Sequence, residues 1–119
     1  MRKVVNIDIR FIPYEAQRYD TCGDWWCEGE TLHIRASETE ETPSAFLVAL
    51  HELVESWLCR DLGITEEEVD RWDAAFGDQG ELEPGDDPAA PYHRQHRQAM
   101  LIEHLMANFM GLTDYGTVS

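Results

Sequence analysis

The stretch that decides the fold runs from Ala45 to Arg60, AFLVALHELVESWLCR. Its apolar residues recur at the three- and four-residue intervals of a helix; they are Leu47, Leu50, Leu53, Val54, Trp57 and Leu58. Thr42 precedes Pro43, which suits an N-cap followed by proline at the first helical position. Because apolar side chains occupy most of the circumference, we expect this helix to be central and buried.

One arc of the predicted helix is polar and holds His51, Glu52, Glu55 and Ser56, within roughly 140° of each other. An imidazole and carboxylates are costly to bury unless another group compensates them, and a bound metal ion would do so. His51 and Glu55 lie one turn and about 40° apart, so both can reach one ion. Glu52 is offset from them, at a position where it could hold a metal-bound water.

A later helix, predicted over residues 92–111 and ended by Gly111, carries His96 and Glu103 on an otherwise apolar face. The simplest account is that the two helices face each other and share one ion. His51, Glu55 and His96 would then form a three-ligand site with an open position, as in catalytic zinc centres. Glu103 would be a fourth ligand or an acceptor that orients an imidazole. The alternative is a buried hydrogen-bonded network of these groups without metal.

The rest of the chain predicts a small α+β domain spanning residues 1–119. Residues 3–12 alternate as a strand whose buried face would carry Val5, Ile7, Ile9 and Phe11. Residues 24–36 read as a hairpin that turns at Glu28-Gly29. We therefore expect a mainly antiparallel three-stranded sheet in residues 1–36, packed on three helices. The helices are predicted at 43–62, at 65–76 with a capping box from Thr65, and at 92–111, with an acidic loop over 77–91.

Several side chains have ordinary structural interpretations. The four tryptophans are expected in the core; they are Trp25, Trp26, Trp57 and Trp72. His93 and His104 are expected to be exposed to solvent. Tyr92 is expected to pack at the start of the third helix, with stabilisation of an oxyanion as the alternative.

Charge and cysteine content narrow the class of protein. The formal net charge is −15, and residues 61–90 contain eleven acids against one base, Arg71. This disfavours nucleic acid as a partner and indicates a solvated acidic surface. Three cysteines without metal-finger spacing indicate reduced thiols and a cytoplasmic protein. We find no apolar run long enough to span a bilayer and no signal peptide, so no membrane partner is expected, and the oligomeric state stays open.

The string HELVE, His51 to Glu55, resembles the HExxH signature of the zincin-like metallopeptidases, with Glu55 in place of the second histidine. The order of a strand, a hairpin ending in LHIRAS, an acidic connector and the HELVE helix is also similar. This resemblance implies a minimal zincin-like fold with zinc bound by His51 and Glu55. It implies Glu52 as the general base, and His96 or Glu103 as the remaining ligand; in the gluzincin branch that ligand is Glu.

The chain also resembles small uncharacterised phage or prophage proteins of the pattern LHELVE…EPGDDPxAPYHRxH. Together these features predict a divalent-metal protein, with zinc as the expected ion, that hydrolyses peptide or amide bonds of a peptide or protein substrate. A carboxylate ligand also suits harder divalent ions. One alternative is a catalytically degenerate zincin-like module whose acidic segment, residues 77–87, meets a basic partner. Another is an acidic decoy for a nucleic-acid-binding protein.

Overall fold

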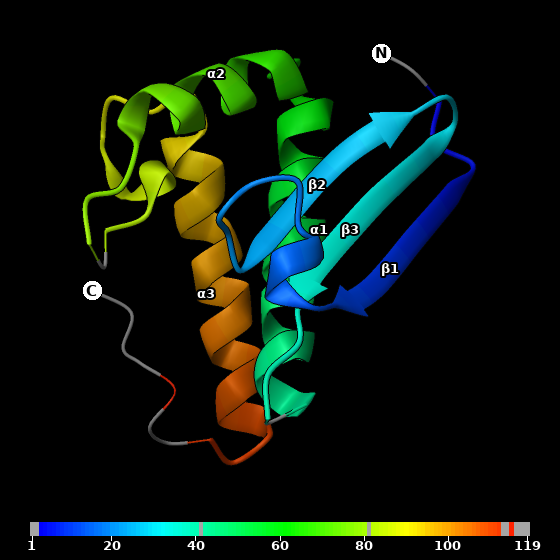
Figure 1. Ribbon diagram of the computed structural model, residues 1–119, viewed down its shortest axis with the longest axis vertical. Coiled ribbons are helices and arrows are strands. Elements are labelled where there is room, and N and C mark those ends of the chain that lie inside the picture. Colours follow the sequence, from blue (N-terminus) through cyan, green and yellow to red (C-terminus); the bar gives the residue numbers. More distant parts are fainter. Residues whose placement is uncertain (1–2, 41, 81, 113–114, 116–119) are drawn as a thin grey trace.

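The computed structural model describes residues 3–40, 42–80, 82–112 and 115. Figure 1 shows a small α+β domain in which a three-stranded sheet packs on helices, as predicted. In chain order the elements are β1 (Asn6–Ile12), η1 (Tyr14–Ala16), β2 (Gly23–Glu28), β3 (Thr31–Ser37), α1 (Thr42–Asp61), α2 (Glu66–Phe76), η2 (Pro84–Asp86) and α3 (His93–Phe109).

The sheet has the order β1-β3-β2, with β3 in the centre. β2 and β3 form the predicted antiparallel hairpin, and Gly29 in its turn adopts a φ of 62°, which favours glycine. β1 is parallel to β3, because the connection through η1 carries the chain to the far side of the hairpin. The sheet is therefore mixed, where the sequence predicted a mainly antiparallel one.

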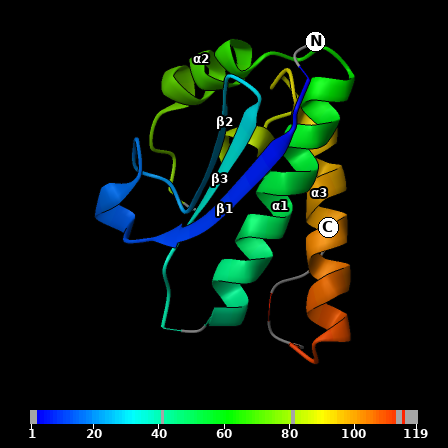
Figure 2. The same ribbon diagram turned by 90° about the vertical axis from the view of Figure 1, so that its right-hand side faces the viewer.

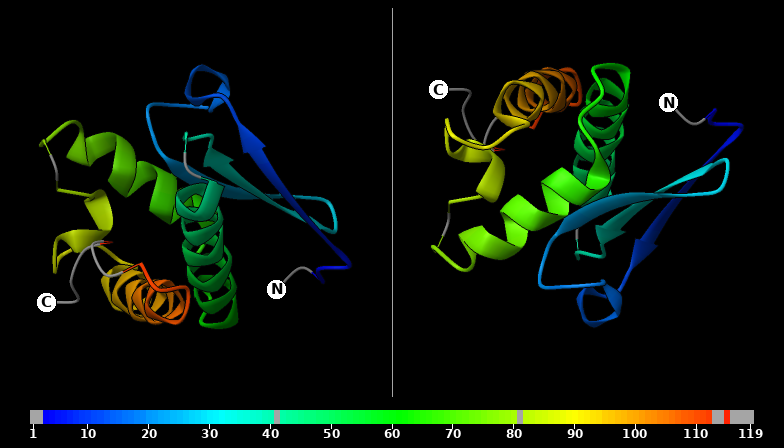
Figure 3. Two further views of the ribbon diagram at one scale, coloured as in Figure 1. Left: turned by 90° about the horizontal axis from the view of Figure 1, so that it is seen from below. Right: turned by 90° about the horizontal axis from the view of Figure 1, so that it is seen from above.

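Helix α1 lies between the sheet and α3, as the end-on views in Figure 3 show. α1 and α3 run side by side in opposite directions (Figures 1 and 2), while α2 crosses near the end of α1. The side of α1 that faces the sheet helps to bury Leu32 and Ile34 of β3 completely. This arrangement places His51 and Glu55 of the polar arc against α3, while Glu52 lies beside Gly23 of β2.

The prediction that one face of β1 is buried is wrong. Ile7, Ile9 and Phe11 are 45%, 45% and 40% exposed. α1 packs against β3 and β2 and leaves the same face of β1 uncovered, because a single helix is too narrow to cover three strands. Trp57 on α1 is 48% exposed for the same reason, so it does not belong to the core, whereas Trp25 on β2 does.

The start of α2, the cysteines and the apolar character of the helices were also predicted from the sequence. Thr65 caps α2 by accepting a hydrogen bond from the Glu68 N–H at 3.2 Å, as the capping box predicts. The three cysteines Cys22, Cys27 and Cys59 are free thiols. Across the described ranges 3–40, 42–80, 82–112 and 115, no helix combines the length and apolar character needed to cross a membrane.

Candidate metal centre

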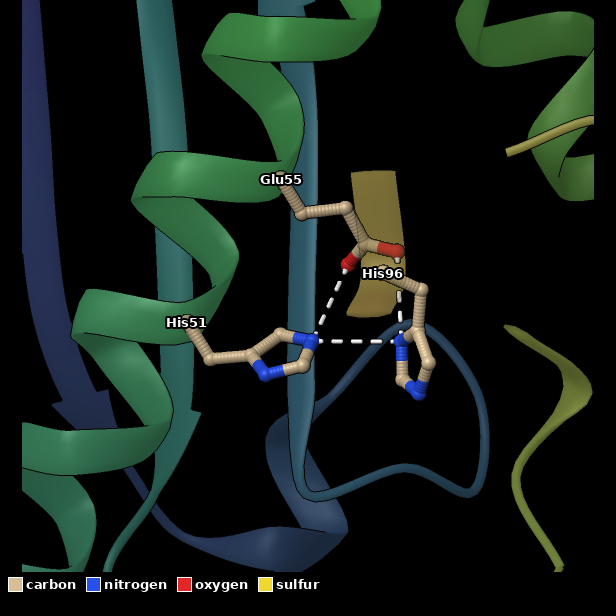
Figure 4. A group of neighbouring side chains, drawn as sticks. All are labelled: His51, Glu55 and His96. Carbon is tan, nitrogen blue, oxygen red and sulfur yellow. Dashed lines mark hydrogen bonds and ion pairs between the residues drawn. The ribbon is translucent and has the colours of Figure 1, made fainter. Parts of the chain in front are cut away.

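The facing sides of α1 and α3 bring His51, Glu55 and His96 together, and Figure 4 shows the three side chains pointing toward one another. His51 Nε2 lies 3.2 Å from His96 Nδ1. The two oxygens of Glu55 lie 3.5 Å from these two nitrogens, one oxygen to each. Ligands at about 2.0–2.1 Å from a tetrahedral ion are about 3.3 Å apart, so the distance between the two nitrogens matches a shared ion. One donor atom from each of the three residues lies within 4.8 Å of the other two, so Glu55 can complete the set.

In each imidazole one nitrogen faces the other imidazole, and the second, outer nitrogen contacts a carboxylate. His51 Nδ1 donates to Glu103 Oε1 at 2.7 Å. His96 Nε2 lies 3.0 Å from Asp86 Oδ1 and 3.1 Å from Glu83 Oε2. In metal sites such partners fix the tautomer and the ring orientation of the ligand. Both inner nitrogens are thereby left to face the centre of the group.

The protonation states of the two imidazoles make this arrangement unfavourable without a cation. If both outer nitrogens carry hydrogen and both rings are neutral, two lone pairs face each other across 3.2 Å. Only a cation between them, an extra proton or a metal ion, makes that arrangement favourable. Glu55 is 4% exposed, and its Oε1 has no hydrogen-bond partner among the described residues, although His96 lies at ion-pair distance. An unsatisfied buried carboxylate oxygen is expensive, and a metal ion would satisfy it.

The electrostatics favour positive charge at this centre. Burial lowers the pKa of His51, but the bonds to Glu103 and Glu55 outweigh it and raise that pKa to about 11. Burial likewise lowers the pKa of His96, and the nearby carboxylates of Glu55 and Glu83 raise it to about 10. Burial raises the pKa of Glu55, yet the two histidines bring it below its ordinary value. Without metal, the centre therefore holds protons where the ion would sit.

The acidic loop takes part in the centre, which the sequence did not indicate residue by residue. η2 approaches His96 so closely that a Cβ on Gly85 would lie 2.5 Å from His96 Cγ. His93 Nδ1 donates to the Gly85 carbonyl at 2.9 Å and ties the loop to α3. Glu83 and Asp86 were predicted only as members of a solvated acidic run. The length of the loop was the one signal that pointed to a function here.

Glu52 lines a cleft of about 680 Å³, and His51, Glu55 and His96 line the same cleft. Burial and the nearby Glu55 carboxylate raise the pKa of Glu52 well above its ordinary value. A Cβ on Gly23, at the start of β2, would lie 2.5 Å from Glu52 Oε1. The missing side chain at Gly23 thus makes room for the Glu52 carboxyl at the wall of the cleft.

The remaining candidate residues lie around the group. Tyr92 is buried, its ring edge faces His96 at 6.4 Å between centroids, and its hydroxyl donates to Asp73. His93 and His104 are half-buried, although they were expected to be exposed. Neither belongs to the candidate metal site of His51, Glu55 and His96. Among the described residues a second group, Glu83, Asp86 and His96, could also hold an ion, but it would use the outer nitrogen of His96 and is more exposed.

Comparisons with protein-family models, curated proteins and solved structures found no match to this chain. The interpretation of the centre therefore depends on its own geometry. That geometry defines a candidate metal site of two histidines and one glutamate between α1 and α3, beside a cleft.

Proposed function

We propose that the protein binds one zinc ion through His51, Glu55 and His96 and hydrolyses a peptide or amide bond in the adjacent cleft. The observation that carries the proposal is the spacing of the three donor groups, 3.2–3.5 Å, with each imidazole anchored from behind by a carboxylate. Two histidines and one glutamate are a donor set of catalytic zinc, and the fourth position would face the cleft.

The zinc ion would polarise the substrate carbonyl and make water a nucleophile near neutral pH. Glu52, which lines the same cleft, would take the proton from that water and pass it to the leaving amine. Burial raises its pKa toward the neutral range, in which a general acid–base works best. Glu103 and Asp86 would keep the two imidazoles in the tautomers that point their free nitrogens inward.

The proposal includes the zincin-like relationship, which is supported by HELVE on a central helix and by a third donor from a later helix. It also makes β2 the strand beside the cleft, since Gly23 and Asp24 line it. The other functional candidate is a binding module with this fold and no turnover. Its support is the exposed acidic side chains of the loop, among them Asp78 and Glu83.

Elemental analysis and a peptidase and amidase screen test the proposal together. The wild-type protein should contain one zinc per chain, and His51→Ala should lose it. Glu52→Gln should retain the metal and lose turnover by about 10²–10⁴-fold, because only the proton transfer is removed. Zinc without turnover on any substrate would support the binding module. Absence of zinc from the wild-type protein, even after incubation with the metal, would overturn the proposed zinc site and the hydrolysis that depends on it.

A further inference from the structure

The outer edge of β1 is free to pair with another strand. β1 lies at one end of the sheet order, and no other strand in the described part of the chain lies beside its outer side. Asn6 N donates to Glu30 O, and Ile12 O accepts from Glu38 N, so the even-numbered residues of β1 bond toward β3. Because backbone groups alternate in direction along a strand, those of Ile7, Ile9 and Phe11 point outward, away from β3.

The apolar face of β1 is exposed next to that edge. Ile7, Ile9 and Phe11 project on the helix side of the sheet and remain 40–45% exposed. Beside them runs an apolar groove of about 400 Å³ that is lined by Ile7, Leu53, Val54, Trp57 and Leu58. A free strand edge with an apolar face is a template for strand addition, and native monomers avoid it by charges, proline or a covering segment.

Charge makes this the favourable surface for self-association. The chain carries −15, but β1 is balanced, with Asp8 and Arg10 on its polar face and Arg35 of β3 bonded to Asp8 at 3.1 Å. The acid-rich segment 61–90 lies on α2 and the following loop, toward the other side of the molecule (Figure 1). Two copies that approach through β1 therefore keep their acidic surfaces apart.

We propose that β1 pairs antiparallel with β1 of a second copy, about a twofold axis at Ile9, to form a continuous six-stranded sheet. In this register Ile9 faces Ile9, Ile7 faces Phe11, and Asp8 faces Arg10 of the other copy. The outward backbone groups then form hydrogen-bonded pairs at Ile7, Ile9 and Phe11. A shift of two residues places Asp8 opposite Asp8 or Arg10 opposite Arg10, which is unfavourable, so charge selects one register.

This pairing covers what the monomer leaves exposed. The apolar residues of the two β1 strands meet on the helix side of the joined sheet, between the two α1 helices and near Trp57. The candidate metal centre lies on the opposite side of α1, toward α3 (Figure 2), so the pairing leaves it open. The dimer does not depend on the function of the metal centre.

Cysteine cross-linking in the full chain tests the register directly. Ile9→Cys in a Cys22→Ser background should form an intermolecular disulfide on mild oxidation, because hydrogen-bonded antiparallel partners have Cα atoms about 5.5 Å apart. Ile7→Cys should not, since its two copies would be offset by about 13 Å. The double variant Ile7→Cys/Phe11→Cys should cross-link again. Equal cross-linking of Ile7→Cys and Ile9→Cys would overturn the register.

Light scattering and sedimentation test the dimer itself. The wild-type protein should show twice the monomer mass of 13.7 kDa, in a concentration-dependent way. Ile9→Lys and Arg10→Glu should be monomeric. The matched controls Leu101→Lys, at an exposed apolar position of α3, and Arg71→Glu, with the same change in charge, should remain dimeric. A wild-type monomer at every concentration, or a dimer that survives both β1 substitutions, would overturn the proposal.

Discussion

The two sides of α1 are opposite in character. Toward α3, the helix buries charged and polar side chains, and His51 and Glu55 are only 7% and 4% exposed. Toward β1, it leaves apolar surface in water, including Trp57 at 48% exposure. Folding ordinarily buries apolar groups and solvates charged ones. Both sides of α1 depart from that pattern: one buries charged groups, and the other exposes apolar ones.

The difference between the two sides indicates what each lacks. A buried polar cluster whose donor atoms face inward needs a cation, because Glu55 Oε1 accepts no hydrogen bond from the described residues. An exposed apolar strand edge needs a partner strand, because its backbone groups and its side chains both point at solvent. One helix thus separates a candidate metal centre from a candidate dimer interface.

The largest expected effect comes from His51→Ala on the polar side. This change removes one donor and leaves Glu55 and Glu103 buried without their shared partner, so the protein should lose zinc and about 3–5 kcal/mol of stability. Denaturant unfolding with and without chelator measures both. His104→Ala, on α3 but outside the candidate metal site, is the control and should retain zinc. If His51→Ala keeps full metal content, the contrast between the two sides of α1 loses its basis.

Two glycines next to the site should give separable effects. Gly85→Ala would push against the ring of His96 and should weaken zinc binding by about 10–100-fold, as when a supporting group of a ligand is lost. Gly23→Ala would push against Glu52 instead and should lower turnover while zinc affinity stays unchanged. Calorimetric titration with zinc, paired with activity assays, distinguishes them. Equal losses of affinity in both variants would contradict the separate roles of His96 and Glu52.

A smaller effect is expected from the pH dependence of stability at Asp73, which also lines the cleft. Burial raises the pKa of Asp73 to about 6, although hydrogen bonds from Tyr92 and Tyr19 oppose the shift. Because the folded-state pKa exceeds the ordinary value of 3.8, this group favours folding at low pH, and the benefit is lost as pH rises through about 6. Relative to Asp73→Asn, the wild type should therefore lose stability between pH 4 and pH 6. Parallel pH profiles of the two proteins would contradict this assignment.

The smallest effect is expected on the apolar side. Trp57→Gln should change the stability of dilute, monomeric protein by less than about 1 kcal/mol, because half of the side chain is already in water. Leu47→Ala, at a fully buried position of the same helix, should cost about 2–5 kcal/mol. Denaturant midpoints give both values. A large loss at Trp57 in the monomer would show that this side of α1 belongs to the core.

The sequence predicted the fold where a local pattern carried enough information. The spacing of apolar residues located α1, the capping box located α2, and alternation located the strands. It could not predict the parallel pairing of β1, because strand order depends on where a connection crosses and alternation is the same for both directions. It also could not predict that the apolar face of β1 stays exposed, because that depends on how far α1 reaches across the sheet.

The candidate metal centre could be predicted only where local helical spacing determined it. Helical spacing placed His51 and Glu55 on one side of α1 and His96 and Glu103 on one side of α3, and the two helices do face each other. The supporting carboxylates Glu83 and Asp86 come from a loop, whose position depends on tertiary contacts such as the close approach of Gly85 to His96. Within an acidic run, no local pattern separates the two acids that reach inward from those that face solvent.

Anomalous diffraction at the zinc edge, from crystals grown with zinc, tests the central claim most directly. We expect one strong peak between α1 and α3, about 2.0–2.2 Å from His51 Nε2, a Glu55 oxygen and His96 Nδ1. Density without a peak, with the two imidazoles hydrogen-bonded directly to each other, would contradict the claim that a metal ion joins these helices.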